Sequence, residues 1–75
     1  MSEKILAVER ILLRNPYGIS TQEIIGRLDN EYGIKAERKS IYSDIAILTR
    51  FMPIDVYRGD NNRNLYFIRT RSETS

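Results

Sequence analysis

Side chains of the kinds that bind nucleic acid recur at regular positions in the second half of the chain. Lys39, Ser43 and Arg50 are spaced by four and seven residues, which would place them on one face of a helix. Arg58 and Arg63 lie on either side of a Gly-Asp-Asn-Asn segment with the composition of a turn. Cationic side chains bind phosphates, and a helix in the major groove reads base edges. The pattern predicts contact with DNA; a solvated helix face and an exposed charged turn are the alternatives.

Four more residues are candidates for the same interface. Arg38 lies near the start of the predicted third helix, and Thr21 and Gln22 begin the second. Helix N-termini carry free amide groups and partial positive charge, which favour a phosphate there. Tyr42 would either touch DNA or pack beside the apolar stripe of its helix. The alternatives are an ion pair with Glu37 or Asp44 for Arg38, and helix capping alone for Thr21 and Gln22.

The composition leaves few enzymatic mechanisms open. The chain has 75 residues with no cysteine and no histidine, which excludes thiolate zinc sites and Cys–His or Ser–His catalytic pairs. Its ten acidic residues are scattered along the sequence. We therefore expect a protein that is not an enzyme, with no cofactor and no metal. The lack of a long apolar run and of a secretory leader predicts a cytoplasmic protein with no membrane partner.

Charge is distributed unevenly along the chain, although the net charge is only +2. Residues 1–37 hold five basic and six acidic side chains, whereas residues 38–75 hold seven basic and four acidic ones. A basic excess in one half of a small domain favours a nucleic-acid partner. An ordinary solvated surface has the same signature, so charge alone does not decide the function.

Two helices are predicted in the first half of the chain. Residues 2–14 carry apolar side chains at spacings of three and four. Ser2 can cap the start of this helix, and Asn15-Pro16 ends it. Residues 20–31 form the second helix, with Ser20 as the capping residue at its start and Gly33 just after its end. Gly26 lies inside this helix, which predicts the close approach of another backbone.

A third helix is predicted over residues 37–51. Ile41, Ile45 and Leu48 form its apolar stripe, opposite the face that carries the polar candidates. Asp44 flanks that stripe. Because a carboxylate facing DNA phosphates would be repelled, we expect Asp44 to be structural and paired with a basic side chain elsewhere.

The pattern changes to alternation after the third helix. Residues 54–68 predict a β-hairpin with its tip at residues 59–62. The connector at residues 17–19 is short enough to supply one extended pairing residue. Three helices followed by a hairpin make an α+β fold, a winged helix-turn-helix whose hairpin is the wing. We expect one domain over residues 1–69 and a polar, disordered tail over residues 70–75.

The third helix also carries a recognisable motif. Residues 37–45, Glu-Arg-Lys-Ser-Ile-Tyr-Ser-Asp-Ile, followed by Leu48, resemble the recognition helix of DeoR-like bacterial repressors. Residues 19–28 are similar to the second helix of that family, and residues 65–68 resemble its wing. Over residues 4–69, the chain most resembles the N-terminal DNA-binding domain of WYL-domain transcriptional regulators.

This resemblance implies sequence-specific binding of double-stranded DNA by a bacterial or phage transcription regulator. The helix at residues 37–51 would lie in the major groove, and the hairpin wing on the backbone or in the minor groove. The resemblance also implies a C-terminal effector-sensing domain outside this chain, and a homodimer on paired half-sites would add specificity. Two positions depart from the family: Ser43 replaces a frequent arginine, and Ala36 replaces a capping serine, which predicts a weakly capped third helix.

The competing hypothesis is a winged helix that binds another protein, such as an adaptor or a phage inhibitor of a host factor. The near-neutral net charge, Ser43 and Ile47 favour this reading. Ile47 and Tyr57 lie off the predicted buried faces, either as scattered surface residues or as part of a contact with a partner. The basic second half and the third-helix motif favour DNA.

Overall fold

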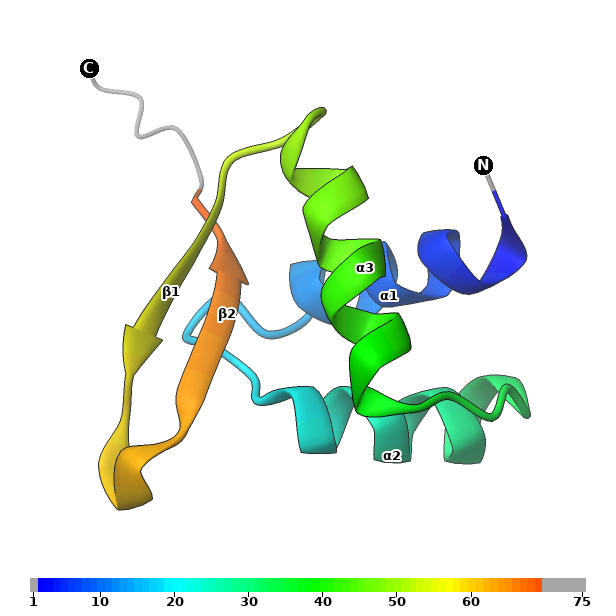
Figure 1. The fold of residues 1–75 in the computed structure, drawn as a ribbon, viewed down its shortest axis with the longest axis horizontal. Coiled ribbons are helices and arrows are strands. Elements are labelled where there is room, and N and C mark those ends of the chain that lie inside the picture. The colour runs from blue at the N-terminus through cyan, green and yellow to red at the C-terminus, as the bar shows by residue number, and fades with distance from the viewer. Residues whose placement is uncertain (1, 70–75) are drawn as a thin grey trace.

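Three helices are followed by a two-stranded antiparallel sheet in the computed structural model, which describes residues 2–69 (Figure 1). The elements are α1 (Glu3–Leu13), α2 (Thr21–Tyr32), α3 (Arg38–Thr49), β1 (Ile54–Arg58) and β2 (Asn64–Ile68), with a 3₁₀ turn at Asp60–Asn62. This order confirms the predicted α+β fold and is consistent with a winged helix. The tail predicted over residues 70–75 lies outside the described residues.

Hydroxyl groups cap the first two helices, as the sequence predicts. The Ser2 side chain accepts a hydrogen bond from the Ile5 amide at 3.1 Å, and the Ser20 side chain accepts one from the Glu23 amide at 3.2 Å. At the end of α2, Gly33 takes the left-handed conformation, with a φ of 66°. These bonds satisfy backbone groups that a helix end leaves without an internal partner. Among the described residues, no helix is long and apolar enough to cross a membrane.

The third helix begins at Arg38, and its N-cap is Glu37 rather than the predicted position 36. The Glu37 side chain makes no capping hydrogen bond, so the predicted weak cap is confirmed one residue further along. The helix is also shorter at both ends than the predicted range of residues 37–51. Its apolar stripe faces the core and the polar residues opposite are exposed, as predicted.

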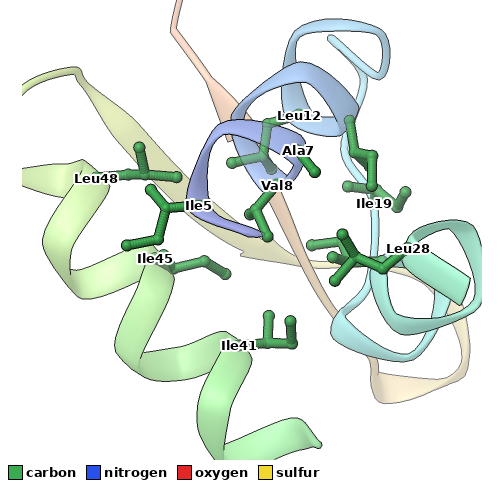
Figure 2. Close-up of a cluster of buried hydrophobic side chains, with 11 residues drawn as sticks. Ile5, Ala7, Val8, Leu12, Ile19, Leu28, Ile41, Ile45 and Leu48 are labelled. Atoms are coloured by element: carbon green, nitrogen blue, oxygen red, sulfur yellow. The ribbon is translucent and has the colours of Figure 1, made fainter. Parts of the chain in front are cut away.

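The core lies where the inner faces of the three helices meet (Figure 2). The connector between α1 and α2 adds one more side chain to it, that of Ile19. The buried apolar residues are Ile5, Ala7, Val8, Ile11, Leu12, Ile19, Ile24, Leu28, Ile41, Ile45 and Leu48. Each large side chain removed from water in this way contributes about 1.5–3 kcal/mol, which makes this cluster the main source of stability.

An ion pair at the edge of the core joins α1 to α3. The Lys4 ammonium donates hydrogen bonds to the Asp44 carboxylate and to the Ser40 hydroxyl. Asp44 is buried, and this pairing confirms the prediction that it is structural. Because a carboxylate in this position needs its partner, the pair fixes the register between the two helices.

The hairpin packs one of its faces against the helices. Its strands are aligned so that Ile54 lies opposite Ile68 and Val56 lies opposite Tyr66. Ile54, Tyr66 and Ile68 are partly buried against the core. On the other face, the rings of Tyr57 and Phe67 meet edge to face, with centroids 5.8 Å apart. The hairpin side chains that pack against the core are therefore those on the Ile54 face.

Gly26 does not lie against another backbone, so that interpretation of the sequence is wrong. A Cβ atom built on Gly26 meets no atom within 4 Å, and the residue is exposed on α2. At a solvent-facing helix position, glycine destabilises the helix through its backbone entropy. No close contact at position 26 requires the absence of a side chain.

We therefore expect Gly26→Ala to stabilise the domain by about 0.5–1 kcal/mol, since alanine loses less backbone entropy in a helix. The measurement is the midpoint of chemical denaturation. An unchanged or lower midpoint would contradict the open surroundings of this position.

The Lys4–Asp44 pair gives a second prediction. Lys4→Met should destabilise the domain by about 2–4 kcal/mol, because it leaves the buried Asp44 carboxylate without its partner. Replacing both residues, Lys4→Met with Asp44→Leu, should recover most of that loss, because no unpaired charge remains. A double variant no more stable than Lys4→Met alone would show that the unpaired Asp44 carboxylate does not cause the loss of stability.

Candidate nucleic-acid interface

A groove of about 240 Å³ opens where the hairpin turn approaches the starts of α2 and α3. Figure 1 shows the hairpin turn at the end of the molecule where both helices begin. Five residues predicted for the interface line this groove: Thr21, Gln22, Arg38, Tyr42 and Arg63. The fold thus brings three separate segments of the chain together around one concave surface.

The groove is suited to an anion. Arg38 enters from the α3 side and Arg63 from the hairpin, while the first turn of α2 contributes Thr21 and Gln22. Its lining, which lies wholly within the described residues, contains no acidic side chain. Free amides and partial positive charge at the start of α2 add to the two guanidinium groups. Asp44 is bound to Lys4, so it is not the ion-pair partner considered for Arg38.

The other four predicted residues lie outside the groove. Lys39, Ser43 and Arg50 share the outer face of α3, and Arg58 ends β1. All four are exposed. The predicted residues therefore form two neighbouring parts: a groove between α2, α3 and the hairpin, and the convex outer face of α3.

The groove contains residues that the sequence analysis missed. Tyr66, Asn62, Asn64 and Ser20 also line it. Burial raises the pKa of the Tyr66 phenol, and the neighbouring Tyr42 raises it further. Its hydroxyl therefore keeps its proton at neutral pH and can donate to an anion. Strand alternation identified Tyr66 as a hairpin residue but contained no signal for this position, because the groove forms only when the hairpin docks.

Backbone pairing holds the hairpin against the helices. The Ile19 amide donates to the Tyr66 carbonyl at 2.9 Å, and the Tyr66 amide donates to the Ile19 carbonyl at 2.8 Å. The one extended pairing residue predicted in the connector is therefore confirmed. A second contact lies beside it, where the Tyr57 hydroxyl donates to the Tyr17 carbonyl at 2.6 Å. These bonds fix the position of the wing relative to α2.

The hairpin turn is held in one conformation by its own backbone. Asn61 and Asn62 have φ values of 64° and 57°, the left-handed region that asparagine tolerates better than most residues. The Gly59 amide donates to the Arg63 carbonyl at 2.8 Å and closes the turn. Arg63 is therefore presented to the groove from a fixed base.

Tyr57 and Ile47, which lie off the predicted buried faces, have different surroundings. Tyr57 packs against Phe67 and donates its hydroxyl hydrogen bond, so it has a structural role although its ring is half exposed. Ile47 is exposed on α3 one turn before the exposed Phe51. Ile47 and Phe51 thus add exposed apolar surface at the C-terminal end of α3.

Comparison of the chain with known families, curated proteins and solved structures gives no match. Across residues 2–69, acidic side chains do not gather in any group of three that could hold a metal ion. The groove and the outer face of α3 are therefore the features that bear on function.

The contact between the connector and the hairpin gives a third prediction. Gly18 has a φ of 111°, and a Cβ atom built on it would lie 2.9 Å from the Leu65 Cβ and 3.1 Å from the Tyr57 ring. Gly33 has a φ of 66°, but a Cβ there meets nothing within 4 Å. Gly33→Ala should therefore cost about 1–2 kcal/mol from backbone strain alone. Gly18→Ala should cost at least about 1 kcal/mol more, because the hairpin must also move.

Equilibrium denaturation of the two variants measures this difference. Equal losses of stability would mean that the connector does not contact the hairpin as closely as the structure has it.

Proposed function

We propose that this domain binds double-stranded DNA with sequence specificity, as the DNA-binding part of a bacterial or phage transcription regulator in the cytoplasm. The observation that carries the proposal is the groove, where two arginines and the start of α2 meet with no acidic side chain. Its shape and charge suit a sugar–phosphate strand better than a neutral ligand.

In this proposal, the two parts of the surface have different tasks. The outer face of α3 enters the major groove, where Lys39, Ser43 and Arg50 reach base edges or phosphates. Beside it, Arg38 from α3 and Arg63 from the hairpin hold one strand in the groove. Arg58, at the end of β1, extends the contact along the same wing. Phosphate contacts set the register of the domain, and α3 then reads the sequence.

The resemblance of α3 to the recognition helix of DeoR-like and WYL-domain regulators supports the same proposal. By that resemblance, the domain works together with an effector-sensing domain. A single domain with few base-reading side chains has limited specificity, and a homodimer on two half-sites would increase it.

A protein–protein interaction module is the second candidate. The observation that favours it is the exposed apolar pair of Ile47, on α3 and 39% exposed, and Phe51, just after α3 and 68% exposed. Neither side chain lines the groove. An absence of duplex binding would favour this candidate.

Salt dependence tests the proposed function. If about four phosphates are neutralised, the slope of log affinity against log salt should be near −3 to −4 for each protomer, because each contact releases condensed counterions. Arg38→Ala and Arg63→Ala should each weaken binding and make the slope shallower by about one unit.

Arg10→Ala is the control of matched charge, because Arg10 is exposed on α1 and does not line the groove. It should leave the slope unchanged. Absence of duplex binding at low salt would refute the proposal, and an equal effect of all three variants would place the phosphate contacts elsewhere.

A further inference from the structure

The outer surface of α3 has a second strip of side chains, beside the polar one. Tyr42, Ala46 and Thr49 are spaced by four and three residues, so they follow one line along the helix. All three are exposed. This strip runs along the flank nearer the groove, because Tyr42 also lines the groove.

Two of the three side chains offer methyl groups to a ligand, and the third offers an aromatic ring with its hydroxyl. Ala46 has only its methyl group. The Thr49 hydroxyl donates to the Ile45 carbonyl at 2.7 Å, so the methyl of this side chain is left as its free group. Tyr42 is 46% exposed and presents part of its ring. Ala46 and Thr49 therefore both present a methyl group on the outer side of α3.

Resting on the proposed binding to duplex DNA, we infer that this strip reads the 5-methyl groups of thymines in the major groove. The thymine methyl is the one apolar group that base pairs display there, and alanine and threonine methyls are suited to contact it. A guanine or cytosine edge placed against Ala46 would lose water without gaining a hydrogen-bond partner. The strip thus favours thymine both by attraction and by exclusion.

The geometry also limits how many bases are read this way. From Tyr42 to Thr49 the helix advances about 10 Å, at about 1.5 Å per residue. Base pairs are stacked about 3.4 Å apart, so the strip covers about three of them. The longer cationic side chains of Lys39 and Arg50 lie at the two ends of α3 and reach bases or phosphates outside this segment. We therefore expect an A·T-rich centre in the preferred site.

Replacement of thymine by deoxyuridine tests the inference directly, because deoxyuridine keeps the base pairing and lacks only the methyl group. A duplex pool of random sequence is first selected with the parent domain, and each thymine of the enriched site is then replaced in turn. At least one replacement should weaken binding about fourfold, the effect of burying one methyl group. In Ala46→Gly, that replacement should no longer matter.

Ile47→Gly is the matched control, because it also places a glycine at an exposed position of α3, at a residue that belongs neither to the strip nor to the groove lining. It should retain the discrimination between thymine and deoxyuridine. If every replacement leaves the affinity of the parent unchanged, or if discrimination survives in Ala46→Gly, the inference is wrong while DNA binding stands. If the parent binds no duplex at low salt, the proposed function and the inference both fail.

Discussion

The candidate interface depends on the backbone pairing between Ile19 and Tyr66. This pairing joins the connector to the hairpin by two backbone hydrogen bonds. The two strands of the hairpin form a sheet only with each other. An isolated hairpin of this size is only marginally stable in water. Once docked, it brings Arg63 to the same groove that Arg38 lines from α3. Docked in this way, Tyr66 is partly buried against the core and also lines the groove.

The orientation of α3 depends on a different set of contacts. Ile41, Ile45 and Leu48 fix which face of the helix is buried, and this determines which face is offered to a partner. Lys4 and Asp44 then fix the register of α3 against α1. The buried ion pair also removes the one acidic side chain of α3 from the surface. The α3 surface is therefore free of acidic side chains between its capping residue and its end.

The sequence predicts this fold well because its signals are local. Helical spacing, capping serines and the change to alternation after α3 each act over a few residues. The groove could not be predicted in full, because it depends on tertiary docking. Tyr66 belongs to it only because Ile19 pairs with the hairpin. Gly26 was interpreted wrongly for a related reason: a glycine has the same local signature whether it faces a neighbouring backbone or solvent.

The central claim is that the groove and the outer face of α3 form one surface for duplex DNA. The most direct measurement is an NMR titration of the labelled domain with a short duplex at low salt. The account predicts that backbone amide signals of Thr21, Gln22 and Arg63 shift together with those of the outer face of α3. Shifts confined to the exposed side of α1, around Leu6 and Arg10, with the groove signals unchanged, would contradict it.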